Sequence, residues 1–110
     1  MPFEHLRSVQ GLLNFLDDYV FILNEDGKVI FVNKPALHAL GYSMGEIVGQ
    51  DIMTIIPPER KAEASLHIDE MLAGRRDSSP IPLYSKNGAC ISAETRMVKE
   101  TWQGELVTVV

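Results

Sequence analysis

Short β-type runs stand near both ends of this sequence, and only helical patterns lie between them. β-branched and aromatic residues fill 19–23 and 28–32, and the turn from Asn24 to Gly27 between these runs predicts a β-hairpin. Helices grouped between strands, rather than alternating with them, predict an α+β fold with the helices on one face of a sheet. Three further extended runs predict the remaining antiparallel strands: 81–85, 90–99 and 105–110.

The central region divides into several short helices, each with a start or stop signal. Asn33 is placed to cap a helix that Gly41 ends, and Ser43 is placed to cap a second short helix. Asp51 can begin another brief turn. The longest helical candidate runs from 59 to 73, with an acidic start and a basic end that suit the helix dipole.

An amphipathic helix is predicted at the start of the chain, over residues 1–16. Its apolar residues recur at spacings of three and four, which places them along one helix face. Such a helix can cap the domain of residues 17–110 and present a seam to a second copy. The seam consists of Phe3, Leu6, Val9, Leu13 and Leu16.

Length and charge restrict the class of partner. The 110 residues suit one globular domain, and a net charge of −5 argues against a nucleic-acid partner. A lone cysteine, Cys90, has no internal disulfide partner, which favours a reducing, cytoplasmic compartment. No apolar run approaches the ~20 residues that span a bilayer, so no membrane contact is expected from this chain.

The stretch from Phe21 to Ala36 resembles the opening signature of PAS domains. The resemblance extends over nearly the whole chain from about Leu12 onward. It implies a PAS fold, in which a five-stranded antiparallel sheet carries a cluster of short helices on one face and encloses a sensory pocket. Later segments that are similar to the family are Leu40 to Ser43, Glu46 to Gln50, Ile56 to Arg60 and Ser85 to Gly88.

The resemblance implies a homodimeric regulatory module that senses a ligand or signal, not an enzyme. It implies an effector domain beyond Val110, most often a histidine kinase and less often a diguanylate cyclase. A ligand-free dimerisation spacer is the alternative. The residues also argue against an enzyme. The three histidines fall on three predicted helices and form neither a catalytic set nor a metal-ligand spacing.

Strand alternation and helix spacing predict which residues would line a pocket on the helix-covered face. Most are aliphatic, which favours a packed core, since burying each large aliphatic side chain contributes ~1.5 to 3 kcal/mol. A small apolar or weakly polar metabolite is the other interpretation. The predicted lining consists of Ile22, Ile30, Val32, Leu37, Leu40, Ile47, Ile52, Ile56, Leu66, Leu83, Ile91, Ala93 and Thr108.

No cofactor is predicted, although haem stays open as an alternative through His67. This is the only histidine in the 59–73 helix candidate. The resemblance would place a haem ligand near Ala64 or Ser65, about one turn earlier, and one turn displaces a side chain by ~5 Å. An ordinary histidine, either at the surface or with a satisfied side chain, is therefore favoured.

Flavin is the other cofactor alternative, and the resemblance restricts it. Light-sensing relatives carry a reactive cysteine after the short helices, whereas residues 54–58 here contain none, which excludes covalent flavin photochemistry. Trp102 lies beside a predicted turn, outside the expected cavity, and suits a surface or dimer contact. Cys90 is interpreted as a small packed or edge residue of a strand.

Overall fold

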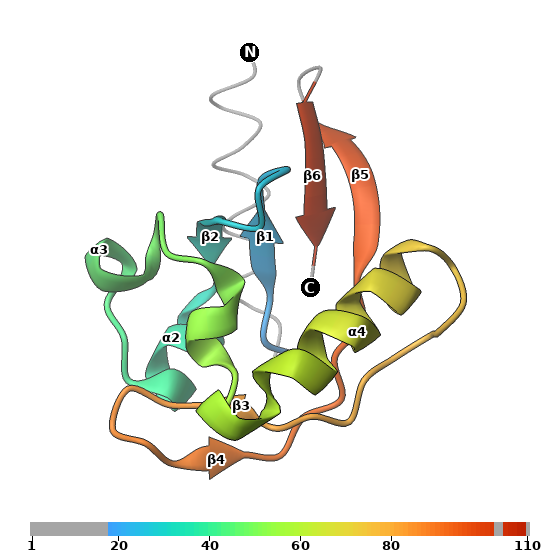
Figure 1. Cartoon of the computed structure of the whole chain (residues 1–110). Helices are drawn as coiled ribbons and strands as arrows, with labels where there is room; N and C mark the ends of the chain where they lie inside the picture. Colours follow the sequence, from blue (N-terminus) through green and yellow to red (C-terminus); the bar gives the residue numbers. More distant parts are fainter. Residues whose placement is uncertain (1–17, 103–104, 110) are drawn as a thin grey trace.

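The structure is a computed structural model that describes residues 18–102 and 105–109, with side chains described through Met97. Helices and antiparallel strands are mixed, as the α+β prediction requires (Figure 1). The predicted helix over 1–16, with its seam of Phe3, Leu6, Val9, Leu13 and Leu16, lies outside the described residues. The elements are β1 (Phe21–Leu23), β2 (Val29–Val32), α2 (Lys34–Leu40), α3 (Met44–Ile47), η1 (Ile52–Ile55), η2 (Pro58–Arg60), α4 (Lys61–Leu72), β3 (Leu83–Tyr84), β4 (Cys90–Ile91), β5 (Val98–Trp102) and β6 (Glu105–Val109).

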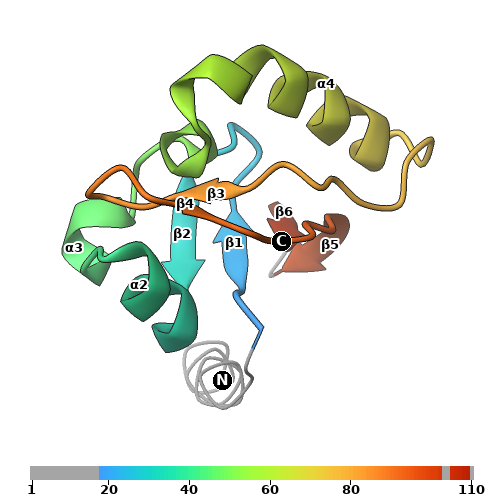
Figure 2. The same cartoon turned by 90° about the horizontal axis from the view of Figure 1, so that it is seen from below.

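Four of the strands form one antiparallel sheet in the order β2-β1-β6-β5, and β3 and β4 form a separate pair. The helix α4 lies across one face of the four-stranded sheet, and α2 and α3 lie beside β2 (Figure 2). The last strand, β6, therefore lies between β1 and β5 in the middle of the sheet.

Within residues 18–102 and 105–109 the five predicted extended runs appear as six strands. The run predicted over 90–99 was wrong as one strand, because it divides into β4 and β5 with the non-strand residues 92–97 between them. Within that gap only Thr95 forms a bridge in the described chain, and its partner is Ser79. The separate β3-β4 pair is the consequence.

The β1-β2 hairpin forms where predicted, and it contains a bulge. The side-chain oxygen of Asn24 accepts hydrogen bonds from the backbone N–H of Asp26 and Lys28, which fixes the turn. The register then slips, because Ile22 pairs with Phe31 whereas the next residue pairs with Val29. Ile30 is the extra residue, and it is 45% exposed. Its assignment to the pocket was wrong because a bulge breaks the alternation of faces.

Asn33 caps α2, as predicted, and also holds the chain that enters β1. Its Oδ1 accepts the N–H of Ala36 at 3.3 Å and the N–H of Val20 at 3.0 Å. Its Nδ2 donates to the carbonyl of Asp18 at 2.8 Å. The side chain is fully buried, so one residue joins the start of α2 to the strand entry.

Ser43 caps α3 in a reciprocal capping box with Glu46. The second carboxylate oxygen of Glu46 pairs with the ammonium of Lys86, from the turn between β3 and β4. The hydrogen bond from Lys86, followed by the backbone bond from Ser43, lowers the pKa of Glu46 from 4.5 to about 2. Glu46 thus connects α3 to the β3-β4 turn.

We expect Glu46 to titrate with a pKa of about 2 in a carboxyl NMR titration. Because the folded-state pKa is depressed, its contribution to stability is present above the ordinary value of 4.5 and is lost as the pH falls toward about 2. Lys86→Gln should raise the pKa of Glu46, and Lys61→Gln should leave it unchanged. An unchanged pKa in Lys86→Gln would contradict the pairing.

The core contains three of the predicted pocket residues, Val32, Leu40 and Ile47, each about 1% exposed. Ile22 is also buried, and Leu37 and Ile91 pack against the core from partly buried positions. None of these six residues lines the cavity described below, although Leu37 also lines a separate, more open hollow with His38 and Tyr42. For these six of the predicted lining residues, the structure agrees with the favoured interpretation of a packed core.

Leu66 was wrongly placed in the pocket, since it is 59% exposed. The buried residues of α4 are Ala64, His67 and Met71, at spacings of three and four. At 3.6 residues per turn, Leu66 lies on the other side of the helix from this stripe. The error came from choosing the apolar side by hydrophobicity, which excluded a buried histidine.

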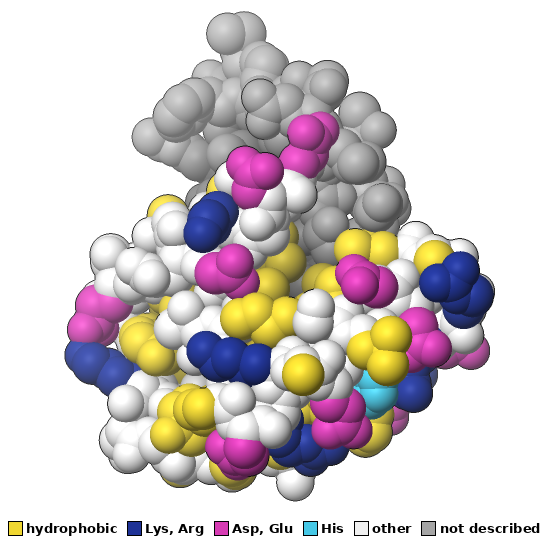
Figure 3. All heavy atoms as spheres, in the orientation of Figure 1, with side chains coloured by type: hydrophobic (Ala, Val, Ile, Leu, Met, Phe, Trp, Pro, Cys, Tyr) yellow, Lys and Arg dark blue, Asp and Glu magenta, His cyan; other side chains and the backbone are white. Residues whose placement is uncertain are grey.

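Charged side chains are interspersed over the face that Figure 3 shows. Two basic pairs, Arg60-Lys61 and Arg75-Arg76, lie near the two ends of α4, and each has an acidic neighbour. Arg60 lies 2.9 Å from Glu63, and Arg76 lies 3.4 Å from Glu70. None of the helices in the described part of the chain is both long and apolar enough to cross a membrane.

Candidate ligand-binding cavity

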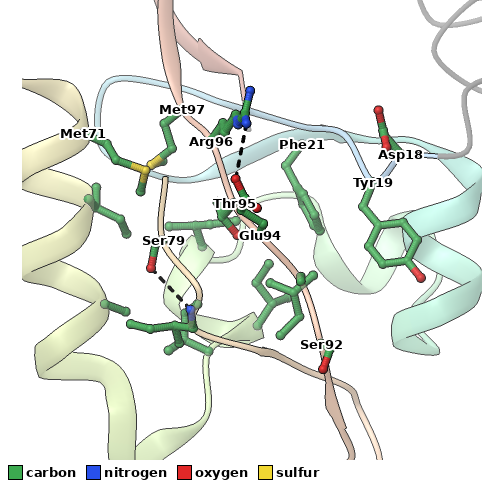
Figure 4. A pocket seen from close by; sticks show the side chains of 18 residues that line it. Asp18, Tyr19, Phe21, Met71, Ser79, Ser92, Glu94, Thr95, Arg96 and Met97 are labelled. Atoms are coloured by element: carbon green, nitrogen blue, oxygen red, sulfur yellow. Dashed lines mark hydrogen bonds and ion pairs between the residues drawn. The ribbon is translucent and has the colours of Figure 1, made fainter. Parts of the chain in front are cut away.

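A cavity of about 320 Å³ lies between α4, η1 and the chain segment that leads into β5. This volume is at the small end of the range for small-molecule sites. Figure 4 shows the side chains around it. The lining residues are Asp18, Tyr19, Phe21, Ile52, Ile55, Ile56, Ala64, Ile68, Met71, Ser79, Ile81, Leu83, Ser92, Ala93, Glu94, Thr95, Arg96 and Met97.

Most of the lining is apolar, and the polar groups come from Ser79 and from two short stretches. α4 contributes Ala64, Ile68 and Met71, one turn apart on its buried side. The side chains of Met71 and Met97 approach one another at one side of the cavity, and Tyr19 lies at the other (Figure 4). Unbranched methionine side chains adapt to differently shaped neighbours, so this wall can accommodate a guest.

Polar groups line the cavity at residues 18–19 and 92–96. Glu94 and Arg96 lie 3.3 Å apart and are mostly exposed, so their ion pair contributes little to stability. The exposed Cys90 belongs to β4 and does not line this cavity. Among the described residues, no cluster of His, Cys, Asp and Glu could hold a metal ion.

His67 is buried on α4 and has a defined partner. Its Nδ1 lies 2.7 Å from the Oγ of Ser79, and the two residues are 8% and 4% exposed. The N–H of Ile81 also donates to this Oγ, at 3.4 Å. Ser79 lines the cavity but His67 does not, so the ring lies behind the wall. Of the two ordinary roles left open for this histidine, the geometry matches the satisfied side chain and not the surface position.

We expect Ser79→Ala to lower the free energy of unfolding by about 1–2 kcal/mol, because it leaves a buried ring nitrogen of His67 without its partner. Urea denaturation measures the change. Ser92→Ala, at an exposed position of the same cavity, is the control and should change stability by less than about 0.5 kcal/mol. Equal effects of the two substitutions would contradict the role of the His67–Ser79 contact.

Comparison with known proteins decides the family. A family model described as a PAS domain matches residues 17–110. The chain belongs to the PAS domain family. No curated protein matches the chain at a significant level. The neighbours among solved structures agree with the fold, since they are PAS domains from several proteins.

Three solved structures illustrate the similarity. A PAS domain from Desulfitobacterium hafniense is 28% identical, with a TM-score of 0.79 over 90% of this chain and 93% of that one. A PAS domain from a two-component sensor histidine kinase is 14% identical, with a TM-score of 0.79 over 99% and 95%. A domain of a sensor histidine kinase/response regulator from Geobacter sulfurreducens is 17% identical, with a TM-score of 0.70 over 96% and 91%.

Four of the predicted lining residues do line the cavity of this PAS domain: Ile52, Ile56, Leu83 and Ala93. Thr108, also predicted to line the pocket, pairs with Leu23 and Lys99 through its backbone in β6. Its side chain is not among those that the structure describes. The side chain of Trp102, the last residue of β5, also lies outside it.

The prediction missed several residues that line the cavity. Ala64, Ile68 and Met71 carry the three-and-four spacing of a helix face, which the sequence displays once His67 is allowed to be buried. Ser79 and Ile81 alternate with the predicted Leu83 as strand residues do, so a count that began at Ser79 would have found them. Asp18 and Tyr19 carry no comparable signal.

Proposed function

We propose that this PAS domain is a sensor that binds a small, mostly apolar molecule in the cavity. Binding changes the conformation of the domain, and the domain relays this change to an output domain. The observation that carries the proposal is the cavity of about 320 Å³ beside the packed core. A spacer without a ligand has no need of this hollow, because filling it with side chains would add ~25 cal/mol for each Å² of apolar surface buried.

Two parts of the cavity lining are adjacent in sequence to the terminal segments of the domain. Asp18 and Tyr19 directly follow residues 1–17, and Met97 directly precedes β5. β5 pairs along its whole length with β6, the last strand of the chain. A ligand that binds one arrangement of this wall better than another shifts the population toward that arrangement, which is the mechanism we propose for signalling.

A histidine kinase is the output domain that we propose. The support is that PAS domains of similar structure come from a two-component sensor histidine kinase and from a sensor histidine kinase/response regulator. A diguanylate cyclase is the second candidate. A reducing compartment, and hence the cytoplasm, is part of the proposal, because the single cysteine has no partner within the chain.

Self-association through residues 1–16 completes the proposal, with the apolar seam of the sequence as its basis. The double substitution Leu6→Glu and Leu13→Glu should convert a dimer to a monomer in light scattering. Glu4→Gln together with Gln10→Glu is the control, because it leaves the seam residues unchanged. A double variant that remains dimeric would contradict self-association through this seam.

The sensor proposal is tested by native mass spectrometry of the gently purified domain, with absorption spectroscopy on the same sample. We expect a second mass that exceeds the chain by one small molecule, and release of that molecule on denaturation. A spectrum without haem or flavin bands would agree with the apolar cavity. A Soret band would instead direct attention to His67, and an unliganded mass throughout would favour the spacer.

A further inference from the structure

The buried part of the cavity offers no free polar side chain to a ligand. Among the described residues that line it, Ser79 is the only buried one with a polar side chain. Its Oγ lies 2.7 Å from the Nδ1 of His67 and accepts the N–H of Ile81 at 3.4 Å, so the protein itself satisfies this hydroxyl. No buried side-chain nitrogen or oxygen of the described residues lacks a hydrogen-bond partner. A polar group would lose its hydration here without a side-chain partner in exchange, so the buried part of the ligand is hydrocarbon.

The charged side chains that line the cavity are exposed and form its rim. Within the described part of the chain they are Asp18, Glu94 and Arg96. The guanidinium of Arg96 lies 3.3 Å from the carboxylate of Glu94, and these two charges offset each other. The carboxylate of Asp18 has no hydrogen bond or ion pair with another described residue. The rim therefore keeps one negative charge, which attracts a cation and repels an anion.

The backbone that carries Asp18 and Tyr19 is held in place before any ligand binds. The side chain of Asn33 bonds to this segment on both sides of Tyr19. Its Nδ2 donates to the carbonyl of Asp18 at 2.8 Å, and its Oδ1 accepts the N–H of Val20 at 3.0 Å. Because Asn33 is itself fully buried, a ligand that meets Asp18 and Tyr19 has little backbone to order.

Tyr19 adds an aromatic ring to the lining next to Asp18. The residue is partly buried and lies at the end of the cavity opposite Met71 and Met97 (Figure 4). The face of an aromatic ring attracts a cation, as a carboxylate does. One end of the cavity therefore favours a positively charged group, and the methionine end favours hydrocarbon.

We infer that the ligand of this cavity is a small amphipathic amine, with an ammonium group at one end of an apolar body. The body lies in the apolar part of the cavity, toward Met71. The ammonium group lies at the rim, where it pairs with the carboxylate of Asp18. This inference rests on the proposed function and adds the ligand class to it.

The test compares three probes that share a benzyl group and differ in their polar end, by NMR titration of the whole wild-type chain. The probes are 2-phenylethylamine, which is cationic, 2-phenylethanol, which is neutral, and phenylacetate, which is anionic. The methyl resonances of Met71 and Met97 report entry of the ring, and the amide resonance of Tyr19 reports the rim. We expect the amine to bind about tenfold more tightly than the alcohol, because it adds a charged hydrogen bond to Asp18, and phenylacetate to bind most weakly.

Two matched variants locate the charge that selects the amine. Asp18→Asn removes the carboxylate but keeps the backbone carbonyl that Asn33 binds, and it should lower the affinity for the amine about tenfold, to that of the alcohol. Asp26→Asn makes the same change of charge at an exposed residue outside the cavity lining, and it should leave both affinities within about twofold. High salt should weaken binding of the amine and not of the alcohol, because screening acts on exposed charges.

The outcomes separate this inference from the proposed function. Equal binding of the amine and the alcohol, or an equal effect of the two variants, overturns the amine class and leaves a cavity that binds small apolar molecules. Tightest binding of phenylacetate overturns it in favour of an acid whose carboxylate meets Arg96. Binding of none of the probes, with no shift at Met71 or Met97, overturns both the inference and the sensing role of the cavity.

Discussion

Asn33→Ala is expected to lower the free energy of unfolding by about 3 kcal/mol. The substitution removes the cap of α2, which costs about 1 kcal/mol, and leaves the buried N–H of Val20 without an acceptor, which costs about 1–3 kcal/mol more. The carbonyl of Asp18 loses its donor at the same time. Urea denaturation measures the total, and hydrogen exchange of the Val20 amide should become faster.

Ser43→Ala is the matched control for that experiment. Ser43 also caps a helix and also accepts a backbone N–H, at 3.3 Å, but its hydrogen bonds are exposed. We expect this cap to contribute only about 0.5–1 kcal/mol. Comparable losses in the two variants would show that Asn33 acts as a helix cap alone, and would contradict its role in holding the strand entry.

Ala64→Met is expected to empty the site of ligand and to stabilise the unliganded domain. Ala64 lies on the buried side of α4 and lines the cavity. A methionine side chain there occupies the space that a guest would use, so retained ligand should fall at least about tenfold. Filling the hollow should raise the free energy of unfolding by about 1–2 kcal/mol, at ~0.8 kcal/mol for each buried methylene.

Ala62→Met is the control, because Ala62 is an exposed residue of the same helix. It makes the same chemical change away from the cavity and should alter neither ligand content nor stability by more than about 0.5 kcal/mol. The sign of the Ala64→Met effect is decisive. A loss of 1–3 kcal/mol, typical of an overpacked core, would mean that the space beside Ala64 is filled.

Local signals in the sequence predicted the hairpin, the caps and most element types. The Asn24 turn and the Asn33, Ser43 and Asp51 caps depend on side chains that bond to backbone a few residues away. Such local interactions can be predicted from short stretches of sequence. The α+β class followed from the order of these elements, and the resemblance added the PAS fold.

The features that failed depend on contacts between distant segments. The bulge at Ile30 arises where two strands pair, and the break in the 90–99 run arises opposite Pro80 and Pro82, on another segment. The side of α4 that faces the core includes His67, whose ring contacts Ser79 on another segment. Each error moved residues to the wrong face, which is why only part of the cavity lining could be predicted.

An accessible hollow beside the core should admit xenon, and methyl NMR under xenon pressure detects such binding. Xenon enters apolar cavities that side chains leave empty. We predict saturable shifts of the Met71 and Met97 methyl resonances under xenon pressure, their loss in Ala64→Met, and no saturable shift at the exposed Met44. Small, linear shifts of all three methyls would contradict the cavity and, with it, the sensing role.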